Sequence, residues 1–189
     1  MNVSLKWLGA LVDIKGMNPD DMAETLTVDG IPVEHVIRPG EGIKGVVTGK
    51  ILSVEKHPDA DHLLICQLDV GEEEPVQIVT SASNVKEGQI VPCALSGAHV
   101  PAAHDNKAPG GLRHGDIKIK AGKLRGVKSA GMMCSLGELG MDANLFPALN
   151  HEGILILPED TPVGVDIHTL YDLDDVVYEM ELTANRADC

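Results

Sequence analysis

The feature that most constrains the fold is a series of short apolar segments in the middle of the chain. They are separated by turns rich in Gly, Pro and Asp, a pattern typical of β-strands. Strands are predicted at 46–54, 63–70, 76–79, 89–95 and 117–120, and residues 97–115 are predicted to form a long surface loop. Gly49 lies within the first segment, where it permits a bend. Such strands predict a small closed barrel, such as an OB-fold.

The two ends of the chain have a different pattern. A helix is predicted at 4–12 with Ser4 as its cap, and a second after Asn18, where Pro19 suits the first helical position. Residues 31–37 are predicted to form an edge strand, because Pro32 cannot donate a backbone hydrogen bond.

A second change of pattern comes near Asn150. Short strands are predicted at 153–158 and 176–182. The predicted fold class is therefore α+β, with the barrel inserted into a small discontinuous helix/strand domain. The first part of that domain is 1–39, the barrel domain is 40–151, and the second part is 152–189. The chain ends without a terminating pattern, which indicates a piece of a longer protein.

Composition restricts the core and the compartment. Aromatic residues make up 2% of the 189 residues, so the core must be aliphatic. No apolar run approaches the roughly 20 residues that span a bilayer, and the N-terminus lacks a signal-peptide pattern. The four cysteines are far apart and form no Cys-x-x-Cys pair. A reduced, cytoplasmic location is expected.

A basic segment stands out against the acidity of the chain. The formal net charge is -14, yet residues 110–130 hold six Lys or Arg and one Asp. A basic island in an acidic chain indicates a local anion-binding surface. A solvated strand face is an equally good interpretation of the charge alone.

Four stretches together resemble one family. Residues 47–63 (VTGKILSVEKHPDADHL) and 123–135 (KLRGVKSAGMMCS) resemble the opening and closing signatures of a tRNA-binding OB module. Residues 26–34 (LTVDGIPVE) and 181–189 (ELTANRADC) resemble the flanks of that module in the bacterial phenylalanyl-tRNA synthetase β subunit. The resemblance covers the whole chain in order.

That resemblance implies a large α2β2 enzyme that charges tRNA with phenylalanine, using ATP and Mg²⁺. The aminoacylation centre would lie in the α subunit and the editing site in later parts of the β subunit. This chain is therefore expected to hold no catalytic residue, metal site or cofactor. Its expected partners are tRNA and the α subunit, with neither a membrane nor DNA involved. Two positions depart from the family pattern, because His62 replaces a usual Lys and Ala184 a usual Pro.

Residues that could contact tRNA follow from charge and from these motifs. Cationic side chains supply charge to phosphates without reading bases. The predicted set is Lys50, Lys56, His62, Asn84, Lys123, Arg125, Lys128 and Ser129. Residues 43–135 contain no Phe, Tyr or Trp on which bases could stack, so binding should be electrostatic and show little sequence preference.

Two alternatives remain open. The chain could be a structural or assembly segment with negligible tRNA affinity of its own. A small metal-dependent hydrolase is a further alternative, because two His and two Asp lie between His57 and His62, and zinc accepts such ligands. Turn chemistry explains the same stretch, since Pro58 fixes φ, and Asp59 and Asp61 can bond nearby backbone N–H groups.

Overall fold

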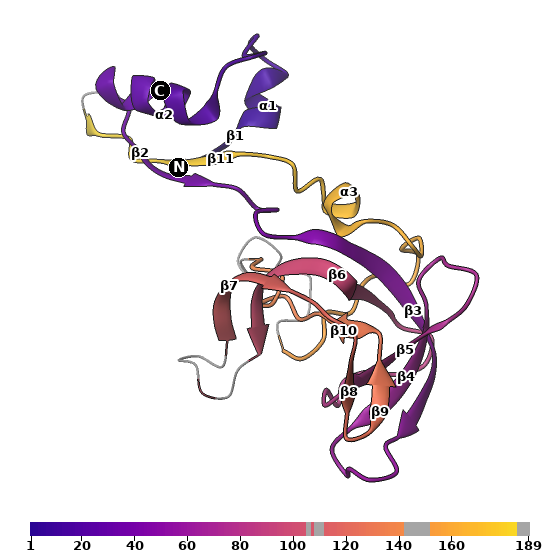
Figure 1. Cartoon of the computed structure of the whole chain (residues 1–189). Helices are drawn as coiled ribbons and strands as arrows, with labels where there is room; N and C mark the ends of the chain where they lie inside the picture. Colours follow the sequence, from indigo (N-terminus) through magenta and orange to yellow (C-terminus); the bar gives the residue numbers. More distant parts are fainter. Residues whose placement is uncertain (105–106, 108–111, 142–151, 185–189) are drawn as a thin grey trace. The chain divides into compact units, whose positions relative to one another are not determined.

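A computed structural model describes residues 1–104, 107, 112–141 and 152–184. The expected change of pattern near Asn150 and the motif residues 185–189 lie outside these ranges. The protein is mostly β-sheet with a few short helices (Figure 1). It divides into two compact units, of which the first joins Met1–Glu41 to Asp172–Cys189 and the second is Gly42–Tyr171.

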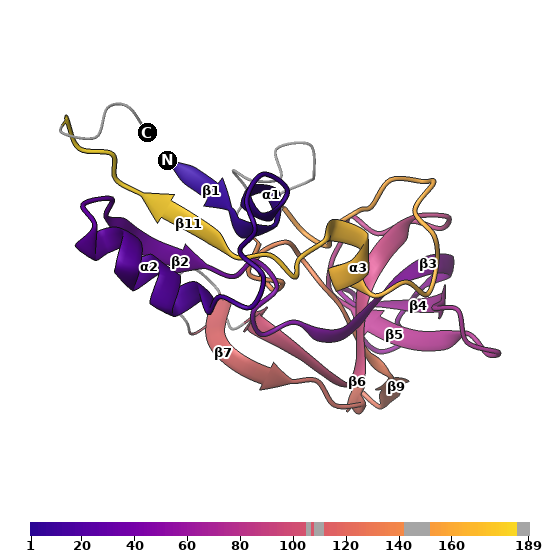
Figure 2. The ribbon, with the colours of Figure 1, turned by 90° about the horizontal axis from the view of Figure 1, so that it is seen from above.

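The first unit is a three-stranded antiparallel sheet with two helices on one of its faces (Figures 1 and 2). The strand order β1-β11-β2 brings the two ends of the chain into one sheet. The elements are β1 (Asn2–Ser4), α1 (Leu5–Gly9), α2 (Pro19–Val28), β2 (Val33–Ile37) and β11 (Val177–Met180). The core residues are Leu5, Ala23, Tyr178 and Met180.

Both predicted helix starts are confirmed. The Ser4 hydroxyl accepts a hydrogen bond from the Trp7 N–H, and the side-chain Oδ1 of Asn18 accepts from Asp20 N–H at 2.8 Å. Each cap pairs an N–H group that has no partner within its helix. The first helix ends at Gly9, earlier than the apolar pattern predicted.

The second unit contains the predicted β-rich segment. Its strands are β3 (Lys44–Lys56), β4 (Leu64–Asp69), β5 (Val76–Thr80), β6 (Ile90–His104), β7 (Leu112–Lys118), β8 (Gly122–Leu124), β9 (Val127–Ser129) and β10 (Gly131–Met133), followed by α3 (Ile167–Tyr171). The main sheet has the order β10-β6-β3-β4-β5, and β7 also pairs with β6. The strands β8 and β9 form a separate hairpin.

The two edge strands of this sheet, β10 and β5, approach each other. Ala130, between β9 and β10, donates its N–H to the carbonyl of Gln77 in β5 at 2.8 Å. The N–H of Val79 donates to the Ser129 hydroxyl at 3.0 Å. The unit is therefore barrel-like, around an aliphatic and sulfur-containing core. That core includes Ile51, Cys66, Leu68, Ile78, Val91, Cys93 and Met133.

Gly49 is required by close packing. A Cβ atom there would lie 2.7 Å from the Cys93 Sγ and 3.0 Å from Val70 Cγ1. The irregular pairing of β3 with β4 occurs further on, between Ile51 and Ser53. The sequence predicted that Gly49 permits a bend, whereas the structure shows that a glycine is needed there because two strands approach closely.

The predicted surface loop at 97–115 is wrong where the structure describes it. Strand β6 continues to His104 and pairs with β7. Ala98, Val100 and Ala102 alternate as buried residues along it. These residues alternate with a period of two, as in a strand, but their side chains are small and add little hydrophobicity to the pattern. The neighbouring Gly, Pro and His residues therefore suggested a loop.

The segment 152–171 belongs by its contacts to the second unit, whereas the sequence placed it in the outer domain. Before α3 it consists of bends, turns and isolated bridges at Leu157 and Asp166, so its described residues form no regular strand at 153–158. Leu155 N–H donates to Cys134, Leu157 N–H to Ile90, and Thr48 N–H to Val165, at 2.8–3.0 Å. These three bonds fix the segment to β3, β6 and the end of β10.

Candidate nucleic-acid interface

The β8–β9 hairpin is the most basic element of the described chain. Its turn residues Arg125 and Gly126 have φ values of 49° and 88°, the left-handed geometry of a two-residue type I′ turn. Gly126 adopts this conformation readily, whereas an Arg does so rarely. Lys123, Arg125 and Lys128 are all exposed on this hairpin, and residues 122–129 contain no acid.

Two of these cations face each other. Lys123 and Lys128 are direct register partners across the ladder. Like charges in opposite positions of a strand pair destabilise it. Within the residues that the structure describes, neither lysine has a carboxylate partner. An anion bound between them would remove the repulsion, so the pair favours a phosphate site over a neutral solvated face.

His57 attaches the β3–β4 turn to the hairpin. Its ring is buried, and its Nδ1 accepts a hydrogen bond from Asp59 N–H at 3.0 Å. The opposite ring nitrogen, Nε2, therefore carries the proton and donates to the Leu124 carbonyl at 3.2 Å. This bond ties the β3–β4 turn to β8. Lys56 precedes His57 and His62 lies in the same turn, and both are exposed.

Lys50 lies apart from this cluster. It is exposed in β3, where its register partners are Asp69 and Ile90. Six residues of strand separate it from Lys56, which is about 20 Å at the usual rise per residue. The structure therefore groups Lys56 and His62 with the hairpin and leaves Lys50 beside an acid.

The other two predicted contacts serve the fold. Asn84 donates from its side-chain amide to Ile154 O at 2.8 Å and accepts from Ile154 N–H at 3.1 Å. Ser129 is buried, and its hydroxyl accepts from Val79 N–H and donates to Gly131 O at 2.9 Å. The sequence could not separate these roles from RNA binding, because every partner except Gly131 lies at least 50 residues away.

The metal interpretation of residues 57–62 gains no support. Both ring nitrogens of His57 have backbone partners. Across the described residues, no group of three or more His, Cys, Asp or Glu side chains could hold a metal ion. The stretch does form a turn, but the bond within it runs from Asp59 N–H to the His57 ring and not to an Asp59 or Asp61 carboxylate, which were the predicted acceptors.

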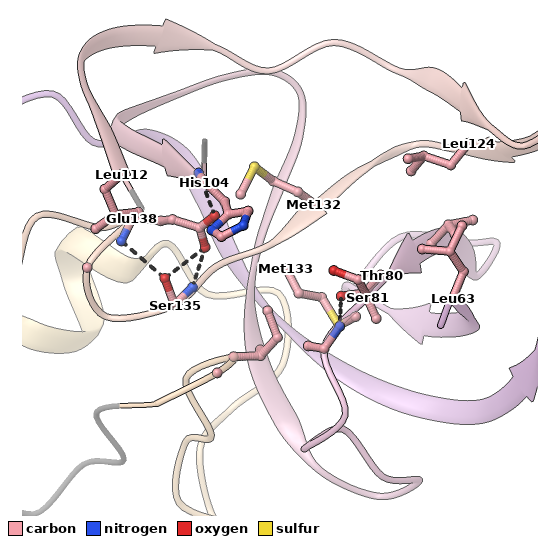
Figure 3. Close-up of a pocket in the computed structure, with 15 residues that line it drawn as sticks. Leu63, Thr80, Ser81, His104, Leu112, Leu124, Met132, Met133, Ser135 and Glu138 are labelled. Atoms are coloured by element: carbon pink, nitrogen blue, oxygen red, sulfur yellow. Dashed lines mark hydrogen bonds between the residues drawn. The ribbon is translucent and has the colours of Figure 1, made fainter. Parts of the chain in front are cut away.

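A cavity next to the hairpin was missed by the sequence analysis. Its volume is about 660 Å³, and its walls come from strands β5, β7, β8 and β10 and from the turns beside them. In Figure 3, Leu63 and Leu124 lie at one end of it, and Leu112 and His104 lie at the other. Met132 and Met133 both line the cavity, and Met133 also contributes to the barrel core.

The carboxylate of Glu138, in this cavity, is already hydrogen-bonded within the protein. Glu138 is buried, and its Oε2 accepts from the N–H of Ser135 at 2.8 Å and from the Ser135 hydroxyl at 2.9 Å. The Ser135 Oγ accepts in return from Glu138 N–H at 3.2 Å, which is the reciprocal bonding of a capping box. This pairing explains the burial of an acid without a ligand.

A family model supplies the decisive comparison. The model described as "Putative tRNA binding domain" matches residues 46–166, which is more than half of the chain and includes the hairpin, the turn and the cavity. The chain belongs to this tRNA-binding domain family. Its basic hairpin is therefore a feature of a nucleic-acid-binding module.

Relatives extend the likeness over the whole chain. The phenylalanine–tRNA ligase β subunit of Clostridium tetani is 47% identical over 189 residues, and that of Bacillus subtilis is 47% identical over 188 residues. The chain spans 22% of the length of each. The solved C-terminal domain of Plasmodium vivax p43 is 21% identical, with a TM-score of 0.39 over 66% of this chain and 58% of that domain.

No helix in the described part of the chain is long and apolar enough to span a bilayer.

Proposed function

We propose that this chain is the tRNA-binding, non-catalytic N-terminal segment of a phenylalanine–tRNA ligase β subunit. The observation that carries the proposal is the exposed, carboxylate-free hairpin with Lys123 and Lys128 opposed, in a chain of the tRNA-binding domain family. The whole chain also matches part of the β subunits of that ligase in its relatives. The complete protein then takes part in cytoplasmic, ATP- and Mg²⁺-dependent charging of tRNA, with an α subunit as partner.

The strand arrangement supports an OB-type barrel. The spatial order β6-β3-β4-β5 places three consecutive strands side by side and returns the fourth beside the first, which is a Greek key. The contact of β5 with the β9–β10 segment brings the remaining edges together. In an OB-fold, loops between strands hold the nucleic acid. The 57–63 turn and the β8–β9 hairpin are two such loops. We further propose that this barrel is inserted into the outer unit.

The hairpin acts on the RNA backbone. Three cations can neutralise up to three phosphates, and this interaction carries no sequence information by itself. The net charge of -14 opposes long-range attraction of RNA to the isolated chain. Binding by this chain alone is therefore weak, and tethering to further contacts in the complete enzyme supplies the useful affinity.

A filter-binding titration with tRNA at low salt tests this role. The variant Lys123→Glu, Arg125→Glu, Lys128→Glu should bind at least about tenfold more weakly, because three phosphate contacts become repulsive. The matched control is Lys15→Glu, Lys50→Glu, Lys86→Glu, which changes the net charge equally at exposed positions elsewhere. Equal affinities of both variants would overturn the assignment of the hairpin.

A second, structural role belongs to the first unit. Trp7, Leu11, Val12 and Met17 are 51–76% exposed there. Exposed apolar residues of this size mark interaction surfaces. If the second unit contributes nothing to tRNA binding, deletion of the residues that correspond to 42–171 from an intact relative would leave tRNA charging unchanged. A large rise in KM for tRNA would instead support the binding role.

A further inference from the structure

The cavity beside the basic hairpin has the size of a small-molecule site. Its volume of about 660 Å³ lies within the range of pockets that enclose ligands. Most of its lining is apolar and includes Leu63, Leu124, Met132 and Ile154. Its polar lining residues include Ser135 and Glu138, which lie near His104, and Thr80 and Ser81, which lie near Leu63 (Figure 3). A flat, mainly apolar group with a polar edge matches such a lining.

The cavity and the hairpin share a residue. Leu124 lies between Lys123 and Arg125 in the sequence, yet it lines the cavity. Its side chain remains 44% exposed, so it forms part of the cavity mouth. Leu63, on the other loop tied to the hairpin, lies beside it (Figure 3). A nucleotide whose phosphate rests on Lys123 or Arg125 therefore has this apolar opening next to its base.

The sulfur atoms supply a surface suited to a base. Residues 43–135 hold no aromatic side chain on which a base could stack. Thioether sulfur makes favourable contacts with aromatic rings, and flexible Met side chains adapt to rings of different shape. Met132 and Met133 both line the cavity. A pocket built in this way accepts any base, which agrees with backbone-directed binding.

Hydroxyl groups remain for the polar edge of a base. Thr80 Oγ1 accepts a hydrogen bond from Ala82 N–H at 3.1 Å, which leaves its hydroxyl proton to donate. Ser81 is exposed in the same loop. Glu138 is already engaged by Ser135 and by His104 N–H, so it does not serve the ligand.

We propose that this cavity holds one unstacked base of a bound RNA, while the adjoining phosphates lie on the β8–β9 hairpin. This inference rests on the proposed tRNA-binding function and extends it from charge to base contact. The occupant is an unpaired nucleobase, taken from a single-stranded or loop region, because a base within a duplex is covered by its neighbours.

Two RNA probes of equal charge test the inference. One is a ten-nucleotide oligouridylate, and the other is the same decamer with abasic ribose at every position. Binding to the 189-residue chain is measured by fluorescence anisotropy at low salt. The wild-type chain should bind the base-containing probe about three- to tenfold more tightly, the range expected for thioether–ring contacts.

Variants separate the pocket from the charge. Ala82→Met fills the cavity and Met132→Ala removes part of its wall, so either change should lower the preference for the base-containing probe towards one. Circular dichroism and thermal unfolding identify a variant that fails to fold, and the other variant then decides. Lys123→Ala with Lys128→Ala should weaken both probes by the same factor and keep the preference.

The outcomes distinguish the two proposals. If wild type binds both probes equally while the double lysine variant weakens both, the base pocket is wrong and the phosphate site stands. A preference that survives filling of the cavity would also overturn the pocket. If the wild-type chain binds tRNA at low salt but neither decamer, the base pocket alone is wrong. If it does not bind tRNA either, or if the lysine changes leave tRNA binding unchanged, the proposed function fails and the base pocket fails with it.

Discussion

At the scale of single residues, Ser129 separates a structural role from an RNA contact. Ser129→Ala would leave the buried N–H of Val79 without its acceptor, which costs about 1–3 kcal/mol. Urea denaturation should show that loss in the free energy of unfolding, whereas the tRNA affinity of the folded protein should stay the same. The control is Ser83→Ala, at an exposed position. A stable Ser129→Ala variant with weakened tRNA binding would contradict this account.

The buried cysteines give a prediction about pH. Burial raises the pKa of the Cys66 thiol to about 11 and that of Cys93 to about 12, and it also raises the pKa of Cys134. Because the thiolate is the reactive form, raised pKa values leave little of it at pH 8. Iodoacetamide should modify these three residues only slowly in the folded chain and rapidly in urea, with peptide masses as the measurement. Rapid labelling of any of them at pH 8 without denaturant would refute the prediction.

Roles set by local sequence were predictable at this scale, and roles set by distant partners were not. The caps Ser4 and Asn18 bond N–H groups two or three residues away, so the pattern around them was sufficient. His57 bonds Leu124 across 67 positions, and Asn84 bonds Ile154 across 70. Polar side chains of this kind could be named as candidates, but their partners depend on how the strands pair.

At the scale of elements, close approach of β10 to β6 depends on Gly131. A Cβ atom at that position would lie 2.1 Å from the Ala94 carbonyl oxygen, so Gly131→Ala must displace backbone. Overpacking of this kind costs about 1–3 kcal/mol or more. Gly122→Ala is the matched control, because nothing lies within 4 Å of the added methyl group and its φ is not positive.

Chemical denaturation of both glycine variants measures the difference. Gly122→Ala should change the free energy of unfolding by no more than about 0.5 kcal/mol, as surface substitutions usually do. Equal stability of the two variants would show that β10 does not approach β6 as closely as described.

Strands with strong apolar patterns were predicted well, and weakly patterned ones were not. The predictions at 46–54, 63–70 and 76–79 are confirmed by β3, β4 and β5. The extension of β6 to His104 was missed, because alanines in its second half provide alternation with little hydrophobic signal. The candidate cavity was also unpredictable, since its walls come from seven separated parts of the sequence.

At the scale of the whole molecule, charge is distributed unevenly. The net charge is -14, yet one hairpin is basic. The sequence located that island and its family motif. It could not show that Lys123 and Lys128 are opposed, that Arg125 occupies a left-handed turn position, or that Lys50 lies away from them. These facts depend on the hairpin register and on strand length. They narrow a broad basic segment to the three hairpin cations that we propose as phosphate contacts.

The salt dependence of tRNA binding tests this site most directly. The logarithm of the association constant should fall with the logarithm of salt concentration at a slope of about -0.7 to -0.9 for each phosphate neutralised. Three hairpin cations therefore predict a slope of about -2 to -3 for the wild-type chain. The variant Lys123→Ala, Arg125→Ala, Lys128→Ala should lose most of that slope together with its affinity. An unchanged slope in this folded variant would contradict the central claim that the β8–β9 hairpin holds the tRNA backbone.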